Sequence, residues 1–303
     1  MENLRLPFGE WVEAIVDFIG DTFGWLFDAI ATILGIVYDG LDWVLTTPPF
    51  WVIILVLGAL AWWVKGWKLA TGTAVGLLFI VLVDQWENAM DTLALVLVAS
   101  AIAVVISIPV GIWAARNDTV SRIVRPVLDF LQTMPAFVYL IPAIIFFGVG
   151  AVPGMIATIL FALAPGVRLT ELGIRGVDHE VVEAGQAFGA TRGRILRQIQ
   201  LPLALPSIMA GVNQVIMLSL SMVVIAGMVG AGGLGGEIVR AIGRINVGLG
   251  VEAGVAVVIL AMMLDRMTSA LADKGGARAK RRTVSPKDTQ ASTATAQPAG
   301  AQA

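Results

Sequence analysis

The sequence predicts an all-α membrane protein with about seven transmembrane helices, and three observations support this fold class. Hydrophobic residues make up 57% of the 303-residue chain and charged residues only 14%, whereas soluble domains carry about 45–50% apolar and about 25% charged residues. Seven stretches are apolar over roughly the 20 residues that match the hydrocarbon thickness of a bilayer. When the chain is threaded through these spans, all but three of its twenty Lys and Arg residues fall on one side.

The first segment, residues 1–48, is acidic and aromatic. Trp11, Phe18 and Trp25 are interleaved with carboxylates such as Asp17 and Asp21. A span would bury some of those carboxylates at a cost of a few kcal/mol each, whereas an amphipathic helix on the membrane surface leaves them in water. We therefore predict an external, surface-lying amphipathic helix here, with an eighth span as the alternative.

Residues 49–86 are predicted to hold two additional spans, and residues 87–270 are predicted to hold five more. The stretch at 68–84 is short and rich in glycine. The seven predicted spans cover residues 49–64, 68–84, 91–115, 127–149, 152–172, 203–229 and 249–270.

The basic residues predict the orientation of these spans. If the C-terminus is cytoplasmic, only Arg5, Arg240 and Arg244 lie outside, which follows the positive-inside rule. The N-terminus is then external. Residues 271–303 are basic and then rich in Ala, Thr, Gln and Ser. Because this tail lacks the apolar residues needed to fold, we predict that it is disordered and cytoplasmic.

A polar stretch at 173–202 separates the fifth and sixth spans and is patterned as two short helices. Apolar residues repeat along one face of the first helix, at Val181, Ala184 and Phe188. Gly189 is placed to end that helix, and Thr191 is placed to cap the next one. An exposed apolar stripe of this kind suits docking into a groove on a partner protein. It also fits an amphipathic hairpin lying on the bilayer, and the pattern alone leaves both open.

The same stretch resembles the EAA signature of ABC importer permeases, which reads Glu-Ala-Ala, three residues, Gly, nine residues and Ile-x-Leu-Pro. Here Glu183-Ala184-Gly185 is followed at that spacing by Gly189 and by Ile199-Gln200-Leu201-Pro202. The only departure is glycine in place of the third-position alanine. The resemblance implies that the segment docks an ABC ATPase subunit. The residues that it assigns to docking are Glu183, Ala184, Gly185, Phe188, Gly189, Ile199, Leu201 and Pro202.

Residues 91–270 as a whole are similar to the permeases of proline/glycine betaine importers, which carry quaternary amines. The similarity shows in LQTMPAFVYLIPAIIFFGVGAVPGMIAT at 131–158, QLPLALPSIMAGVNQVIMLSLSMVVIAGMVGAGGLG at 200–235 and VVILAMMLDRMTSAL at 257–271. The resemblance implies a type I (MetI-like) importer core at 87–270, working as a homodimer in the bacterial cytoplasmic (inner) membrane.

The resemblance also implies the partners and the cargo. The partners are an ABC ATPase subunit, an extracytoplasmic substrate-binding protein, a second copy of the chain and the lipid bilayer. The cargo is glycine betaine, proline betaine or another choline-type osmoprotectant. The alternatives are an ABC permease for another small solute, such as an amino acid, and a secondary carrier or channel that acts alone.

The chain carries no motif for chemistry on nucleotides. It lacks the G-x-x-x-x-G-K-[ST] loop that cradles phosphates, and it has no cysteine and a single histidine. We therefore expect no catalytic residue, no metal site, no cofactor and no nucleic-acid partner for this chain. ATP and Mg²⁺ are expected to bind the partner ATPase.

Polar residues in the sixth predicted span are candidates for the translocation path, because intramembrane polar groups often mark transport routes. They equally well fit hydrogen bonds to neighbouring helices. These candidates are Asn213, Gln214, Ser219 and Ser221. Met134 and Pro135 interrupt the fourth predicted span, where a broken helix is suited to a gate.

Overall fold

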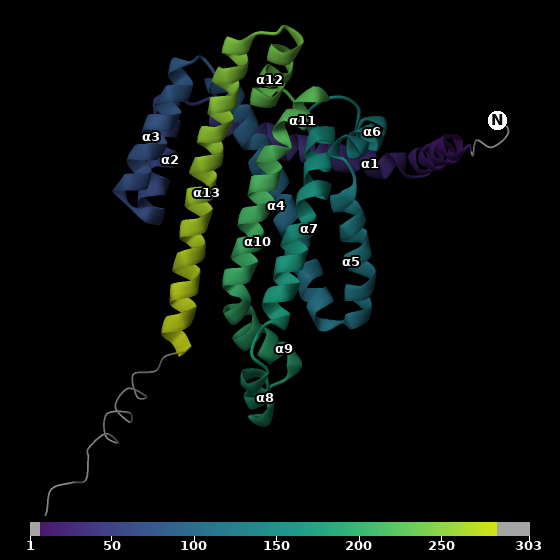
Figure 1. Ribbon diagram of the computed structural model, residues 1–303, viewed down its shortest axis with the longest axis vertical. Helices are drawn as coiled ribbons and strands as arrows, with labels where there is room; N and C mark the ends of the chain where they lie inside the picture. Colours follow the sequence, from purple (N-terminus) through teal and green to yellow (C-terminus); the bar gives the residue numbers. More distant parts are fainter. Residues whose placement is uncertain (1–6, 284–303) are drawn as a thin grey trace, which may run out of the picture.

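The computed structural model describes residues 7–283, and every regular element within that range is a helix (Figure 1). This confirms the all-α class. The α-helices are α1 Phe8–Thr46, α2 Phe50–Lys65, α3 Trp67–Leu82, α4 Trp86–Arg116, α5 Asp118–Thr133, α6 Ala136–Phe147, α7 Ala151–Arg175, α8 His179–Ala187, α9 Arg192–Ile195, α10 Leu201–Ser221, α11 Val223–Met228, α12 Gly233–Gly243 and α13 Val247–Thr283. A π-helical turn, Leu196–Gln200, joins α9 to α10.

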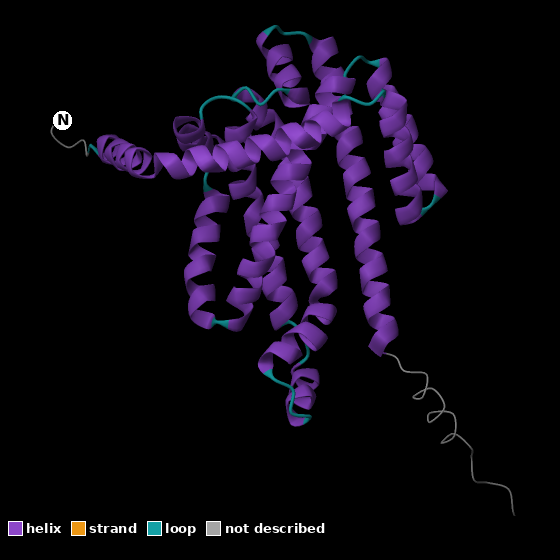
Figure 2. Cartoon of the chain, turned by 180° about the vertical axis from the view of Figure 1, so that it is seen from behind, coloured by secondary structure: helices purple, strands orange, loops and turns teal. Residues whose placement is uncertain are grey.

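Four long helices, α4, α7, α10 and α13, run along the long axis and form the bundle that holds the molecule together (Figures 1 and 2). Small residues let α4 and α7 approach closely. A Cβ added to Gly111 would lie 2.6 Å from the Cβ of Thr170 and 2.7 Å from the carbonyl oxygen of Val167. Membrane helices associate through such small-residue contacts because lipid gives no hydrophobic drive between them.

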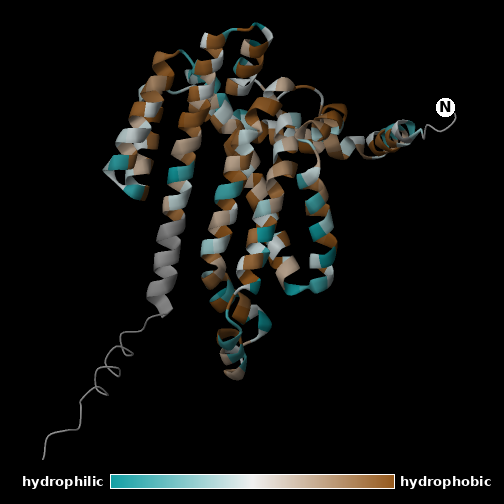
Figure 3. Cartoon of the chain, viewed as in Figure 1, coloured by the Kyte–Doolittle hydropathy of each residue, from teal (hydrophilic) through white to brown (hydrophobic). Residues whose placement is uncertain are grey.

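The two ends of the bundle differ in character. One end carries α8, α9 and the C-terminal part of α13, and the opposite end carries α11, α12 and α1 (Figure 1). Hydrophilic residues gather around α8 and along α5, whereas apolar residues predominate over the upper part of the molecule (Figure 3). We call the first of these the α8 end.

The N-terminal helix α1 runs across the bundle rather than along it, on the side away from the α8 end (Figures 1 and 2). It is held by a few contacts: the ring of Phe27 stacks on Phe146 of α6 with centroids 4.4 Å apart, and Leu34 and Leu45 are buried. By length and composition α1 is also able to span a membrane. The surface helix and the eighth span therefore both stay open as predictions.

The predicted spans at 49–64 and 68–84 correspond to α2 and α3, which form a hairpin beside α13 (Figure 1). Each has 16 residues and is therefore about 24 Å long, short of the roughly 30 Å hydrocarbon layer. In the described part of the chain, five helices are long and apolar enough to span, or six if the bent pair α5 and α6 is one span. That set includes α1 and omits α2 and α3, so it differs from the seven predicted.

The predicted span at 127–149 is not one straight helix. Its residues divide between α5 and α6, which meet at an angle of 99°. The cause is local: Pro135 disfavours helical geometry in the residue before it, and Met134 is extended, with φ −68° and ψ 135°. The predicted span at 203–229 lies within one long candidate span, Arg192–Met228, in which α11 continues α10 after a single turn residue.

The predicted disordered tail, 271–303, is helical in its described part. The helix α13 continues to Thr283, and residues 284–303 lie outside the described range. Extending an existing helix avoids the cost of nucleating a new one, and the run from Ala272 to Arg282 contains several Ala, Lys and Arg residues, which are good helix formers. The prediction from composition that disorder begins at residue 271 was therefore wrong for residues 271–283.

Candidate functional site

The helix α8 projects from the α8 end of the bundle as a small exposed unit (Figure 1). Asp178 caps its start by accepting a hydrogen bond of 3.0 Å from the backbone N–H of Glu180. None of its residues is buried, and Phe188, directly after it, is 93% exposed. A phenylalanine held in this way at the tip of a helix is available to a partner.

The predicted apolar face of α8 is confirmed as an exposed face, because Val181, Ala184 and Phe188 are all accessible. The opposite side of the helix rests on the return segment. A Cβ added to Gly185 would lie 2.8 Å from Cδ1 of Ile199. An alanine at the third signature position would therefore require the flexible end of the Ile199 side chain to shift.

The connection from α8 back to the membrane follows the predicted pattern. Gly189 has φ +76°, a conformation that glycine adopts without strain, and it ends the α8 unit. Thr191 caps α9 by accepting a hydrogen bond of 3.4 Å from the backbone N–H of Arg194.

The π-helical turn before α10 was not predicted. Pro202 has no N–H to donate to the carbonyl oxygen of Gln198, as a continuous α-helix would require. One residue earlier, the N–H of Leu201 bonds to the carbonyl oxygen of Leu196, five residues back, rather than to that of Arg197, four residues back. Such π-helical turns occur frequently at functional sites.

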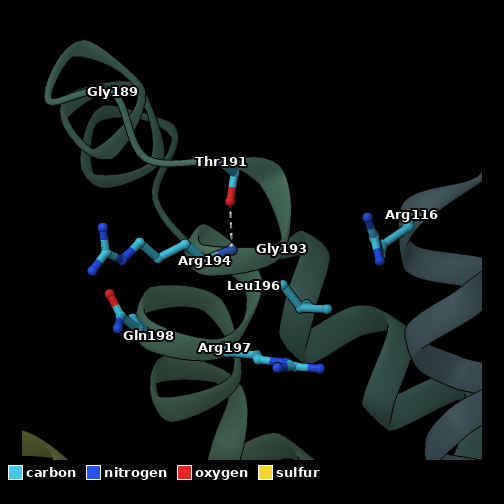
Figure 4. A pocket seen from close by; sticks show the side chains of 8 residues that line it. All are labelled: Arg116, Gly189, Thr191, Gly193, Arg194, Leu196, Arg197 and Gln198. Carbon is cyan, nitrogen blue, oxygen red and sulfur yellow. Dashed lines mark hydrogen bonds between the residues drawn. The ribbon is translucent and has the colours of Figure 1, made fainter.

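Beside α8 lies a basic cleft of about 680 Å³, which is shown in Figure 4. Arg197 extends toward the end of α4, where Arg116 lies, and Arg194 lies on the α9 side (Figure 4). No carboxylate lines the cleft, and none of these three arginines forms an ion pair with a described residue. The other lining residues are Gly189, Thr191, Gly193, Leu196 and Gln198. The cleft is therefore electropositive without an internal counter-charge.

The candidate path residues of α10 divide into two groups. Asn213 donates to Asp265 at 3.0 Å and accepts from Thr268 at 2.5 Å, both on α13. Ser219 is buried and donates to the carbonyl oxygen of Val215, one turn earlier in α10. The side chains of Asn213 and Ser219 are therefore used in hydrogen bonds within the protein, Asn213 to a neighbouring helix and Ser219 to its own.

The second group faces outward. Gln214 and Ser221 are exposed on the same side of α10, with Ala210 and Met217 between and beside them. These residues form an exposed face of α10 in the described part of the chain. Met134 and Pro135 lie at the bend between α5 and α6, with Met134 half-buried and Pro135 exposed.

Sequence reasoning missed an ionic cluster around a buried carboxylate close to the α8 end. Glu171 of α7 is 4% exposed. It accepts hydrogen bonds from Ser121 and Arg125 of α5 and pairs with Arg175 of α7. The sequence shows Glu171 between Arg168 and Arg175, but it does not show that Ser121 and Arg125, 50 and 46 residues away, are its partners.

Residues 107–274 match the model of the family described as the binding-protein-dependent transport system inner membrane component. That region contains α8, its glycine and the complete signature from Glu183 to Pro202. The chain belongs to this family. It is accordingly a multi-pass permease subunit of an importer in the inner membrane.

Relatives of this permease match over most of both chains. The glycine betaine transport system permease protein OpuAB of Bacillus subtilis is 48% identical, over 87% of this chain and 94% of its own. The glycine betaine/carnitine transport permease protein GbuB of Listeria monocytogenes is also 48% identical, over 90% and 99%. The glycine betaine/proline betaine permease protein ProW of Escherichia coli is 44% identical, over 91% and 78%.

The fold of the permease also matches solved structures. A chain of the MetNI methionine ABC transporter, in a structure of inward facing conformations, aligns with a TM-score of 0.59 at 23% identity, over 63% of this chain and 95% of that chain. A second crystal form gives a TM-score of 0.56 at 22% identity. The predicted MetI-like core is thereby confirmed as a fold.

Proposed function

We propose that this permease carries glycine betaine and related quaternary amines into the cell, driven by a separate ATPase that docks on α8. The observation that carries the docking proposal is the exposure of α8 and of Phe188, on a helix that otherwise rests on Ile199. A partner that covers Phe188 would bury a large aromatic side chain, and such residues dominate interface energies. The basic cleft beside it suits carboxylates on the same partner.

The choice of cargo is supported by the relatives. Permeases named for glycine betaine, alone or with carnitine or proline betaine, are 44–48% identical to this chain over at least 87% of its length. The methionine transporter chain has the same fold as this permease at 22–23% identity. That likeness supports the fold and does not support methionine as the cargo. A different small solute remains the second candidate for the cargo.

The proposed coupling runs through rigid-body motion. ATP and Mg²⁺ bind the ATPase subunits, whose closure draws together the α8 units of two permease copies. The bundles then rock and open toward the outside, where a substrate-binding protein delivers its ligand. The two copies are proposed to face each other across the exposed side of α10, with Gln214, Ser221 and the bend at Met134–Pro135 along the path.

The orientation is proposed from the arrangement of the ends. The α8 unit, the turn between α4 and α5 and the C-terminal part of α13 lie toward one end of the molecule (Figures 1 and 2). They hold most of the basic residues, so the positive-inside rule places this end in the cytoplasm. The helix α1 then lies at the outer surface.

The function is tested by reconstituting the purified permease into liposomes with its ATPase. We expect uptake of radiolabelled glycine betaine only when ATP is supplied on the α8 side and the binding protein on the other side. Uptake by the permease alone would contradict the proposed mechanism. ATP-driven uptake of another solute, with no competition by glycine betaine, would contradict the proposed cargo.

The path proposal predicts different effects for two residues of α10. Replacing exposed Gln214 with leucine should lower the uptake rate by about tenfold, the equivalent of one lost hydrogen bond of about 1.4 kcal/mol to the passing solute. Ser219→Ala is the matched control, because its hydroxyl bonds within its own helix. Initial uptake rates at equal protein levels check the difference, and equal rates for both variants would exclude Gln214 from the path.

A further inference from the structure

Glu171 lies near the end of α7 that leads to α8, and it is nearly inaccessible, at 4% exposure. Ser121 Oγ donates to one of its oxygens at 2.7 Å and Arg125 Nη2 donates to the same oxygen at 2.9 Å. Arg175 Nε lies 3.0 Å from that oxygen. A buried carboxylate persists only when it is paired and hydrogen-bonded in this way.

Arg175 extends the cluster to a third helix. Its Nη2 lies 2.7 Å from Asp118, at the start of α5, and donates at 2.8 Å to the carbonyl oxygen of Ala114 in α4. One buried carboxylate and one arginine therefore tie together the ends of α4, α5 and α7.

The cluster lies between α8 and the bend that separates α5 from α6. Arg175 is the last residue of α7, and α8 begins four residues later at His179. In the other direction α5 leads from Ser121 to the 99° bend before α6. The cluster therefore lies between α8 on one side and, through α5, the bend on the other.

We propose that Glu171 is a positioning residue that couples movement of α8 to α5 and to the bend at Met134–Pro135. This rests on the proposed function of α8 as the docking helix. Removing the carboxylate leaves α8 and the ATPase contact intact but lets α7 slide past α5. ATP is then hydrolysed without the matching movement at the bend.

A second ion pair shows why Glu171 and not any charge on α7 has this role. Arg168 pairs with Asp129 and joins the same two helices. Both side chains of that pair are exposed, at 39% and 65%, whereas the Glu171 side chain is 5% exposed, although its partner Arg125 is 59% exposed. An exposed pair contributes little, whereas the buried Glu171 carboxylate is also held by Ser121 and Arg175.

The test compares Glu171→Gln and Arg125→Gln with Arg122→Gln in the permease–ATPase complex. Arg122 lies on the same helix as Arg125, but its guanidinium bonds only to its own helix, at the carbonyl oxygen of Asp118. The number of glycine betaine molecules taken up per ATP hydrolysed should fall about tenfold in the first two variants, a coupling loss of about 1.4 kcal/mol, and stay at the wild-type value in the third.

A second readout does not depend on the cargo. The chain has no cysteine, so Thr133→Cys provides a single thiol beside the bend. Its rate of maleimide labelling should change on addition of ATP in the wild-type background and in Arg122→Gln, and should not change with Glu171→Gln or Arg125→Gln.

Two outcomes would overturn the proposal: an unchanged uptake-to-hydrolysis ratio, or an ATP response at the bend that survives both substitutions. A purely structural role would lower both rates together and leave their ratio intact. Arg125→Gln decides the matter if Glu171→Gln does not assemble, because it leaves Ser121 and Arg175 on the carboxylate. Failure of the proposed cargo appears separately, as a wild-type complex that hydrolyses ATP and moves the bend without taking up glycine betaine.

Discussion

Replacing Gly185 with leucine should leave the permease inserted in the membrane and abolish most ATP-driven uptake. The first side-chain atom at this position would already lie 2.8 Å from Cδ1 of Ile199 and 3.6 Å from the Ile195 side chain. A leucine side chain is larger still, and we expect it to displace α8 from the return segment. Displacement of the docking helix breaks the link to the ATPase, so uptake should fall at least about tenfold, within the usual range of coupling energies. Uptake and ATP hydrolysis measured in the same proteoliposomes check this.

Gly72→Leu is the matched control for that substitution. Gly72 is exposed in α3, away from α8, a Cβ there would meet nothing within 4 Å, and its backbone is not left-handed. It should behave as wild type. Full coupling in Gly185→Leu would show that the close approach of α8 to Ile199 is not needed for docking.

Replacing Gly111 with leucine should prevent the permease from folding stably. Its Cβ would lie 2.6 Å from Thr170 and 2.7 Å from the backbone oxygen of Val167, and a backbone atom cannot move aside as the end of a side chain can. Forcing α4 and α7 apart should cost more than the roughly 1–3 kcal/mol usual for overpacking. Thermal unfolding of the detergent-solubilised protein, or its loss from the monodisperse peak, checks this expectation.

Gly58→Ala in α2 is the control for Gly111, since a Cβ there meets nothing within 4 Å. It should unfold at the wild-type temperature. Wild-type stability of Gly111→Leu would contradict the tight α4–α7 packing.

The local structure of the segment at 173–202 was predictable because its determinants are local. Gly189 ends a helix through its own backbone conformation, and Thr191 caps α9 within three residues. The spacing from Glu183 to Pro202 is itself a sequence property. None of these features needs a distant contact to be recognised.

The Glu171 cluster was not predictable, because its partners lie 46 and 50 residues away in Arg125 and Ser121. Whether a carboxylate near the end of a span faces water or another helix depends on the packing of α5 against α7. Local hydropathy does not encode that packing. The same applies to Asn213, whose partners on α13 are 52 and 55 residues away.

The bend between α5 and α6 was predictable in place but not in size. Pro135 marks where the helix breaks, but apolar residues continue on its C-terminal side, so the stretch reads as one span. The proline does not by itself set the 99° angle, since α6 also packs against α7 and α1, and no local pattern records those contacts.

The most direct test of the docking role is the accessibility of a single thiol at position 188. The chain has no native cysteine, so Phe188→Cys can be labelled alone with a membrane-impermeant maleimide. In inside-out vesicles without the ATPase, Cys at this site should react readily, since the native side chain is 93% exposed. Addition of the ATPase should protect it. Labelling from the outside of intact cells, or labelling that the ATPase leaves unchanged, would contradict the assignment of α8 as the cytoplasmic docking helix.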